Sequence, residues 1–477
     1  MTQYETVIGL EVHAQLLTES KMFCGCCANY AAAPPNMHVC PVCMALPGAL
    51  PVINRLAVEK TIMAGLALHC TIPGTAVFAR KNYHYPDLPK GYQISQYERP
   101  LCLGGWLEIE SAAGTKRVGI TRAHLEEDTA KLMHQGDASL VDLNRAGVPL
   151  LEIVSEPDLR TPEEARSYLT RLQTILRYLG VSQADMEKGQ MRCEANVSLR
   201  PAGQEAFGTK VEIKNLNSFR AVKDSLEYEI RRQAAALDAG ERVVQVTMGW
   251  DDVRGRTVVQ RSKETAEDYR YFPEPDLPPL VVQRDWVEEL EAALPELPDV
   301  KEVRFISELG LDPRDAAVLV ADREVADYFE ATVQAAGGDD PKTVANWIAG
   351  ELFRLMNERV VTIDQVPISP DHLAELMALV RSGQINLNSA KRVLAVMFDS
   401  GRAAPEIVHE LGLTQVSDSG ALEEAVNRVL AKYPGEIVKY REGKTQVLDW
   451  LMGQVMRETR GKANPAIVRE LLRRALE

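Results

Sequence analysis

The sequence lacks any long apolar run and any excess of positive charge. No stretch approaches the ~18 uninterrupted apolar residues that a membrane-spanning helix requires. The first residues, MTQYETVIGLEVH, show neither the basic and apolar regions of an export signal nor an Arg-rich import helix. With 54 Lys and Arg against 68 Asp and Glu, the formal net charge is −14, which disfavours indiscriminate nucleic-acid binding. These absences predict a cytoplasmic protein that does not contact membranes.

The common glycine-rich nucleotide motifs are also absent. No Walker A sequence occurs, and no G-x-G-x-x-G follows a predicted strand. These absences exclude P-loop and Rossmann nucleotide sites, so any ATP must be held by a sheet itself.

The 477 residues exceed the roughly 250–300 that one hydrophobic core can organise, which predicts several domains. Up to about residue 290, alternating strand-like segments mix with amphipathic helices, which predicts an α+β fold with a mainly antiparallel sheet. Prolines recur between Leu277 and Pro298, and beyond them the pattern is helical, with a further break near 401–405. We expect a first domain at 1–293, an all-α domain at 294–404 and a small α-helical tail domain at 405–477.

Five of the eight cysteines lie within twenty residues of one another. Two close pairs on separate turns can give four thiolates to one tetrahedral Zn²⁺. We predict a structural zinc site in an insertion at 24–43, with Cys27 as a spare and with the ligands Cys24, Cys26, Cys40 and Cys43. The alternative is a redox pair at Cys40 and Cys43, but the surrounding prolines disfavour the helix that such a pair needs.

Several predicted strands carry charged residues on one face. Glu11 and His13 share a face, and so do Arg122, His124 and Glu126. The strands 192–200 and 210–214 repeat the pattern with Glu, Lys, Arg and Asn. A sheet with one face in water would show the same alternation. Converging carboxylates among Lys and Arg are, however, what metal-assisted phosphoryl transfer requires. His13 is an unusual ligand for Mg²⁺, which prefers oxygen; it could lie in a second shell or admit Mn²⁺.

Two further segments are candidates for binding. The Pro-bounded run 256–276 mixes basic, acidic and aromatic residues; it is either an ordinary surface loop or the wall of a nucleotide or substrate site. The segment 431–477 contains ten Lys or Arg and six Asp or Glu, a net charge of +4, whereas the rest of the chain carries −18. A solvated helical surface would explain this charge, but a basic tail also suits docking of a polyanion such as tRNA.

Eight stretches together carry a resemblance to a known family: GLEVHAQL, CPVCMALPGALPV, HLEEDTAK, DLNRAGVPLLEIVSEPD, RCEANVSLR, VEIKNLNSF, RSKETAEDYRYFPEPDLPPL and GQVMRETRGKANP. The chain resembles the GatB family of bacterial Glu-tRNA/Asp-tRNA amidotransferase subunits, and it leaves no room for the large insert of the archaeal paralogue. The resemblance implies a cradle domain related in fold to glutamine synthetase and guanidino kinases.

The same resemblance implies the reaction. ATP phosphorylates the side-chain carboxylate of Glu on tRNA(Gln) or of Asp on tRNA(Asn), and ammonia then displaces the phosphate. The implied partners are the glutaminase subunit, GatA, which makes the ammonia, and the small subunit, GatC. The implied cofactors are ATP, Mg²⁺ and structural Zn²⁺.

The resemblance also assigns residues. Glu11, Glu126 and Glu212 match the family's metal-binding acids, with His13 and Glu194 as close candidates. The expected phosphate-stabilising residues are Arg192, Lys210 and Lys214. The expected ATP- or substrate-binding residues are Asn196, Ser198, Arg261, Ser262, Lys263 and Glu264. The expected ammonia exit and acceptor pocket contains Lys81, Tyr83, Tyr85, Asp87 and Lys90. The net charge of +4, and not the resemblance, predicts that the segment 431–477 contacts the tRNA; the expected contacts are Arg457, Arg460, Lys462, Arg469 and Arg473.

Two alternative functions stay open at this point. One is a zinc-containing RNA-binding adaptor without chemistry of its own, which would not need the strand acids. The other is a free-standing carboxylate–amine ligase that acts on a small metabolite without tRNA.

Overall fold

A computed structural model describes residues 3–262, 268–414, 419–441, 443–459 and 463–476. The chain forms two compact units, Met1–Pro298 and Asp299–Glu477. The first is a mixed α+β unit and the second is helical, as the sequence predicts. None of the helices in the described ranges is long and apolar enough to cross a membrane.

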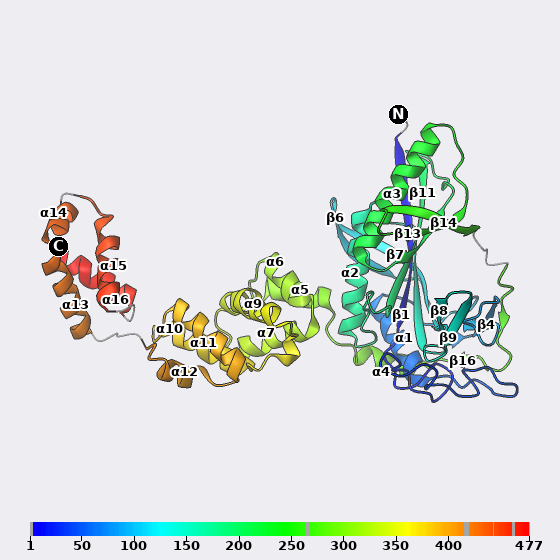
Figure 1. Ribbon diagram of the computed structural model, residues 1–477, viewed down its shortest axis with the longest axis horizontal. Helices are drawn as coiled ribbons and strands as arrows, with labels where there is room; N and C mark the ends of the chain where they lie inside the picture. The colour runs from blue at the N-terminus through cyan, green and yellow to red at the C-terminus, as the bar shows by residue number, and fades with distance from the viewer. Residues whose placement is uncertain (1–2, 263–267, 415–418, 442, 460–462, 477) are drawn as a thin grey trace. The chain divides into compact units, whose positions relative to one another are not determined.

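A large sheet organises the first unit (Figure 1). Its strand order is β14, β13, β12, β11, β1, β10, β7, β5, and β6 also pairs with β7. Among the described strands of this sheet, only β12 and β13 run parallel, so the predicted mainly antiparallel sheet is confirmed. The bounds, from one edge to the other, are Arg256–Ser262, Val246–Asp251, Val211–Leu216, Met191–Pro201, Tyr4–Gln15, Pro149–Ser155, Gly114–Glu127 and Cys102–Leu103, with β6 at Trp106–Ser111.

Apolar residues alternate with polar ones along the central strands, and the apolar face carries the core. On β1, Ile8, Leu10 and Val12 are buried in one hydrophobic cluster with residues of the covering helices. These helices are α1 (Arg55–Ala67), α2 (Pro162–Tyr178), α3 (Phe219–Asp238) and α4 (Arg284–Ala292). Because successive side chains of a strand point to opposite faces, Glu11 and His13 are left on the other face of the sheet.

Local sequence fixes where these helices begin. At the start of α2, Thr161 accepts a hydrogen bond from the backbone N–H of Glu164, and Pro162 occupies the first turn. Ser218 caps α3 in the same way through Ala221. Both caps hold the helices at positions where their apolar stripes meet the sheet.

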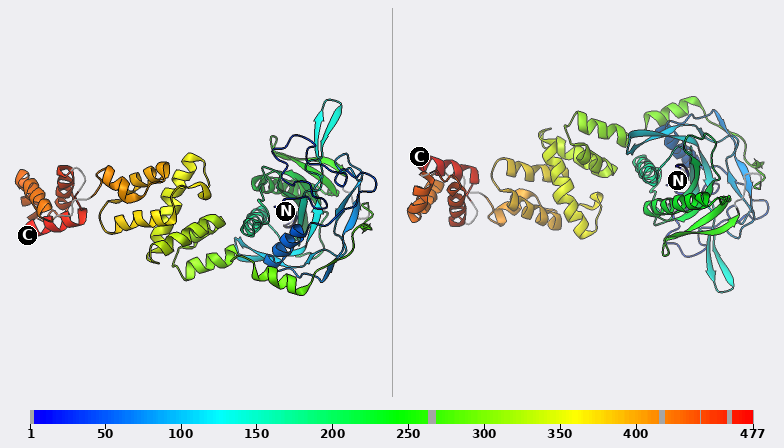
Figure 2. Two further views of the ribbon diagram at one scale, coloured as in Figure 1. Left: turned by 90° about the horizontal axis from the view of Figure 1, so that it is seen from below. Right: turned by 90° about the horizontal axis from the view of Figure 1, so that it is seen from above.

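Shorter strands form separate small sheets. A small sheet is formed by β15 (Phe272–Pro273), β3 (Ala79–Asn82) and β4 (Tyr92–Ser95), and β16 (Leu280–Val281) pairs with β2 (Thr75–Ala76). The strands β8 (Lys131–Gln135) and β9 (Ala138–Asp142) form a hairpin that projects from the unit (Figure 2).

The second unit contains two separate hydrophobic cores, one formed by residues between Phe305 and Val408 and the other by residues between Leu422 and Leu476. The first core involves α5 (Pro298–Ser307), α6 (Pro313–Val320), α7 (Arg323–Ala335), α8 (Pro341–Asn346), the π-helix η1 (Trp347–Leu352), α9 (Phe353–Arg359), the 3-10 helix η2 (Ile363–Gln365), α10 (Pro370–Arg381), α11 (Leu387–Ser400) and α12 (Ala404–Glu410). The second involves α13 (Ser419–Lys432), α14 (Pro434–Arg441), α15 (Val447–Glu458) and α16 (Pro465–Leu476). The expected division at 293/294 and 404/405 stays a prediction.

Candidate active site

The register of four strands places charged residues in a row across the polar face of the large sheet. His13 of β1 lies opposite Arg192 of β11 on one side and opposite Glu152 of β10 on the other. Glu152 in turn lies opposite His124 of β7. The alternation along each strand determines which face of the sheet a side chain lies on. The register between neighbouring strands then places these four charged residues side by side.

Carboxylates and imidazoles meet at the centre of this row. The Nε2 atom of His13 lies 3.3 Å from a carboxylate oxygen of Glu152, 3.8 Å from one of Glu11 and 3.9 Å from one of Glu126. The Nε2 atom of His124 lies 3.6 Å from oxygens of both Glu126 and Glu152. Glu11, His13 and Glu152 can therefore converge on one point, and His124, Glu126 and Glu152 on another, with Glu152 common to both.

Burial and mutual charge shift the protonation of this cluster. Burial, reinforced by the charge of Glu152, raises the pKa of Glu11 to about 7. Burial by itself would lower the pKa of His13, but a hydrogen bond and the negative charge of Glu152 outweigh it and raise that pKa to about 9. Burial likewise opposes ionisation of Glu152, yet His124 and His13 hold its pKa well below the usual range. The ionised form of the buried Glu152 therefore depends on the positive charge of neighbouring side chains.

The small sheet supplies the other wall of the cluster. Ser95 and Gln93 of β4 donate hydrogen bonds of 2.6 and 3.1 Å to the two carboxylate oxygens of Glu126. The Lys81 ammonium of β3 lies 5.1 Å from the ring centre of Tyr269 and 5.9 Å from that of Tyr83. Burial disfavours its charge, but Glu126, Tyr271 and Glu152 raise the pKa of Lys81 well above its usual value. Lys81 is thus a fixed positive charge beside the acids.

These residues fit a divalent cation. Three carboxylates on neighbouring strands offer the oxygen ligands that Mg²⁺ prefers, and the two histidines add nitrogen ligands that Mn²⁺ tolerates. A group of buried carboxylates also needs positive charge to offset its desolvation. The predicted Glu11, His13 and Glu126 are brought together; the predicted Glu212 belongs to neither group of converging ligands in the described residues.

Glu212 lies one row away from the cluster. It is paired with Asn196 of β11 and with Thr247 of β13, and its carboxylate accepts a 2.7 Å hydrogen bond from the Thr247 hydroxyl. Asn196 lies opposite Gly9 in this row, and Ser198 lies one further step along β11. The role of Glu212 as a metal ligand therefore stays a prediction, as do the binding roles of Asn196 and Ser198.

The predicted phosphate-stabilising residues differ in their surroundings. Arg192 donates a 2.8 Å hydrogen bond to Asp128, which is buried. Lys214 donates a 2.8 Å hydrogen bond to Glu194, so these two predicted residues form an ion pair opposite Glu11. Lys210 is exposed and lies just before β12. Arg192 and Lys214 border the cluster with carboxylate partners already in place.

Some predicted residues fall at the margin of the described structure. The backbone of Arg261 and Ser262 ends β14, beside β13 at the edge of the sheet. Lys263 and Glu264 lie outside the described residues. The nucleotide-binding role of this segment stays a prediction.

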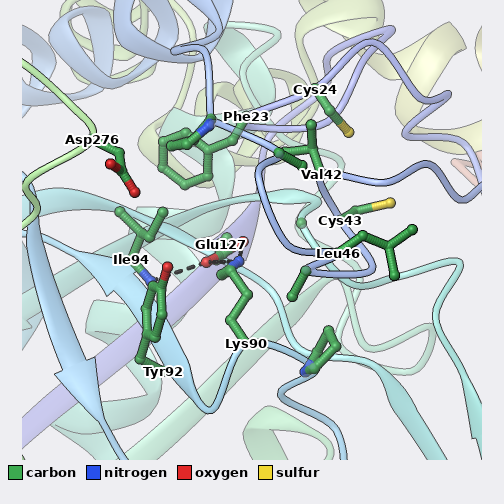
Figure 3. Close-up of a pocket in the computed structure, with 15 residues that line it drawn as sticks. Phe23, Cys24, Val42, Cys43, Leu46, Lys90, Tyr92, Ile94, Glu127 and Asp276 are labelled. Atoms are coloured by element: carbon green, nitrogen blue, oxygen red, sulfur yellow. Dashed lines mark hydrogen bonds and ion pairs between the residues drawn. The ribbon is translucent and has the colours of Figure 1, made fainter.

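The predicted acceptor pocket is divided between two places. Lys81 and Tyr83 lie beside the acid cluster, Tyr85 is exposed, and Asp87 is half-buried. Lys90 instead forms an ion pair with Glu127 and lines a separate cavity of about 210 Å³ (Figure 3).

Figure 3 shows this cavity between the ion pair and the cysteine-bearing segment. Cys24 and Cys43 lie on one side, and Tyr92 and Asp276 form part of the remaining wall. The cavity therefore adjoins the predicted zinc site.

The predicted zinc ligands are brought together. The sulfur atoms of Cys24, Cys26, Cys40 and Cys43 all lie within 4.8 Å of one another. Cys27 is exposed, and its thiol lies 3.7 Å from the carbonyl of Asn29 instead. Hydrogen bonds from Cys24 and Cys40 and the charge of Lys21 lower the pKa of Cys43, which favours the thiolate that binds metal. Four sulfur ligands on two turns fit a tetrahedral Zn²⁺.

Replacing Cys40 by serine is expected to abolish zinc binding and to lower the free energy of unfolding by roughly 3–5 kcal/mol, because metal loss is among the largest single-substitution effects. Metal analysis of protein purified without chelator, together with thermal unfolding, checks this. Cys27→Ser is the matched control, since Cys27 lies next to a ligand but outside the group. Equal zinc content in both variants would contradict the assignment.

The predicted tRNA-contacting residues lie on α15, on α16 and between them. Arg457 and Arg473 are exposed, and Arg469 is exposed but donates a 2.7 Å hydrogen bond to Asp449. Arg460 and Lys462 lie outside the described residues. The final helix is capped by Asn464 and buries Val468, Leu472 and Leu476, which leaves its arginines outside.

Sequence reasoning missed Glu152 and did not select His124 as a site residue. His124 could have been selected, because it lies two residues before Glu126 and shares its face of the strand. Glu152 is the single charged residue of the largely apolar strand PLLEIVS, where a charge without function would be costly to bury. That isolated acid is the signal that could have identified it.

The fold and the site define a class of protein. It is an α+β protein in which carboxylates and histidines that could hold a metal ion lie on the polar face of a mainly antiparallel sheet, beside a buried lysine. Residues 6–288 match the model of the GatB/GatE catalytic domain, and residues 327–476 match that of the GatB domain. The chain belongs to the GatB/GatE family.

Curated relatives match along the whole chain. A protein of Thermomicrobium roseum is 55% identical over 481 residues, covering 100% of this chain and 99% of that protein. One of Roseiflexus sp. is 54% identical over 478 residues, covering 99% and 98%, and one of Dehalococcoides mccartyi is 53% identical over 490 residues, covering 100% of both. Each is named as the GatB-type subunit of an aspartyl/glutamyl-tRNA(Asn/Gln) amidotransferase.

Proposed function

We propose that this chain is the transamidating subunit of an Asp/Glu-tRNA(Asn/Gln) amidotransferase, an ATP-dependent ligase that forms a carbon–nitrogen bond. One observation carries the proposal: the chain is 54–55% identical, over nearly its whole length, to proteins of that name. The sheet-borne acid cluster supports it, because a tRNA-binding adaptor would not need these buried carboxylates.

The chemistry requires activation of a carboxylate. The side-chain carboxylate of Glu or Asp on the tRNA is a poor electrophile, and its phosphorylation by ATP turns one oxygen into part of a leaving group. Ammonia then attacks the carbonyl carbon, phosphate departs, and the amide remains. Charge on the transferring phosphoryl group has to be stabilised throughout.

The residues of the polar face suit these tasks. Glu11, His13, His124, Glu126 and Glu152 would hold a divalent cation, which when bound neutralises charge on the phosphates. Lys81 stands beside the carboxylates as a fixed cation, where it can attract the substrate carboxylate or a phosphate oxygen.

Positioning of the flanking cations is built into the strands. Asp128 holds Arg192 in place, and Glu194 holds Lys214. We propose that these pairs border the substrate, and that Tyr83 and Tyr271 beside Lys81 limit the access of water to the reacting groups.

The proposal includes partners and a more specific fold. The glutaminase subunit, GatA, would supply ammonia through a polar passage, with the small GatC subunit completing a heterotrimer, and the charged tRNA would be the substrate. We further propose that the first unit is a cradle domain related to glutamine synthetase and guanidino kinases. The cytoplasmic location stays a prediction.

Transamidation by the reconstituted heterotrimer tests the function. Glu-tRNA(Gln) and Asp-tRNA(Asn) should each be assayed with and without ATP, and amide formation on at least one of them should require ATP. Turnover of ATP with a free amino acid in the absence of tRNA would instead support a free-standing carboxylate–amine ligase and overturn the proposal.

A further inference from the structure

Arg122 lies on the same face of the sheet as the acid cluster. It is on β7, two residues before His124, and the alternate residues Ala123 and Leu125 of this strand lie in the hydrophobic core. On one side it is paired with Leu103 of β5, and on the other with Val154 of β10. Val154 lies opposite Glu11, so Arg122 and Glu11 belong to one row across the sheet.

Both strand neighbours of Arg122 are apolar, and no carboxylate in the described residues forms an ion pair with it. Its Nε atom is buried and lacks a hydrogen-bond partner in the described part of the chain. Arg192 and Lys214, which face the same site from the other side of β1, each have a carboxylate partner. Arg122 is therefore a cation that the fold places at the site while its buried Nε–H lacks a hydrogen-bond acceptor within the described ranges.

An unsatisfied donor of this kind indicates a missing ligand. Buried N–H groups in native proteins nearly always have a partner, and exceptions occur at functional sites. A guanidinium presents N–H donors in a planar fork that matches a phosphate or a carboxylate. The ligand of Arg122 is thus an oxyanion.

Charge decides between the two oxyanions of the proposed reaction. Glu11, Glu126 and Glu152 make the neighbouring surface acidic, which favours an oxyanion that arrives with a divalent cation over a bare carboxylate. A nucleotide phosphate chain arrives with a divalent cation, and the same acids attract that cation. The acids and Arg122 can then act on the two parts of one cation–phosphate pair.

We propose that Arg122 binds a phosphate oxygen of ATP and helps to hold the phosphoryl group that is transferred. This inference rests on the proposed function, because it takes ATP as the nucleotide. It adds a phosphate-binding residue on β7 to the sheet.

The test is the affinity of the reconstituted heterotrimer for a non-hydrolysable ATP analogue with Mg²⁺, measured by calorimetric titration. Arg122→Gln should weaken this affinity by about 10- to 100-fold, the range for loss of hydrogen bonds to a charged group. Arg122→Lys keeps the charge and should restore part of it. Arg117→Gln is the matched control on the same strand, because Arg117 is exposed and pairs with Glu108.

Each outcome decides a separate question. If the wild-type complex neither binds the analogue nor amidates charged tRNA, the proposed function fails. If it does both, and Arg122→Gln binds the analogue as tightly as the wild type, the inference is overturned. A raised KM for charged tRNA with unchanged analogue affinity would show that Arg122 binds the carboxylate, and would overturn it too. Thermal unfolding of the Gln and Lys variants identifies a loss that comes from misfolding.

Discussion

Replacing Glu152 by glutamine is expected to lower amide formation on charged tRNA by at least roughly 10²-fold, the scale on which loss of one preorganised electrostatic group lowers turnover. Glu152 is common to both groups of converging ligands and lies 3.3 Å from His13 and 3.6 Å from His124. The substitution keeps the shape of the side chain but removes its charge. Measurement of kcat for ATP-dependent amidation by the reconstituted complex checks this.

The control for Glu152→Gln is Glu108→Gln. Glu108 lies on β6, is partly exposed and pairs with Arg117, away from the cluster. Binding of tRNA should be retained in both variants, because Glu152 lies on the sheet and not on the basic helices. Amidation at the wild-type rate in Glu152→Gln would contradict the assignment of the acid cluster. Such a result would revive the adaptor hypothesis, in which the strand acids have no chemical role.

Much of the polar face could be predicted from the sequence, because alternation along a strand is a local property. The alternation places Glu11 and His13 on one face of a strand, and Glu126 on one face of another strand with Arg122 and His124. The family resemblance then singles out Glu11 and Glu126 as metal-binding acids, with His13 as a close candidate. The convergence of Cys24, Cys26, Cys40 and Cys43 was predictable for a similar reason, because close cysteine pairs on two turns restrict the arrangement.

The convergence of residues from different strands could not be predicted in the same way. It depends on strand order and register, which local patterns do not encode. His13 meets Glu152 only because β10 lies next to β1, and Glu212 is separated from Glu11 by β11 and displaced by one row. The approach of Lys81 likewise depends on a separate small sheet. Glu126 and Glu212 were therefore both predicted as metal ligands. The structure places only Glu126 among the converging candidate ligands.

Removal of residues 415–477 is expected to weaken tRNA binding strongly and to leave the acid cluster intact. This segment carries the basic 431–477 region, and its described helices share one hydrophobic core. A deletion that starts at Ala431 would be a poorer experiment. It would leave most of α13, whose Leu422 and Val426 would lose the helices that cover them. The deletion should therefore begin before α13.

The salt dependence of binding shows whether this effect is electrostatic. Each phosphate contact contributes about 0.7–0.9 to the slope of log affinity against log salt concentration, so the truncated protein should show both weaker binding at low salt and a shallower slope. Arg457→Glu combined with Arg473→Glu tests the same contacts without removing the core, because both side chains are exposed. The matched control is Arg323→Glu on α7, an exposed arginine outside the basic segment. Amidation by the double variant should recover at high tRNA concentration, since its chemistry lies on the sheet. Unchanged affinity at low salt in both the truncated protein and the double variant would exclude the basic segment as the tRNA-binding surface.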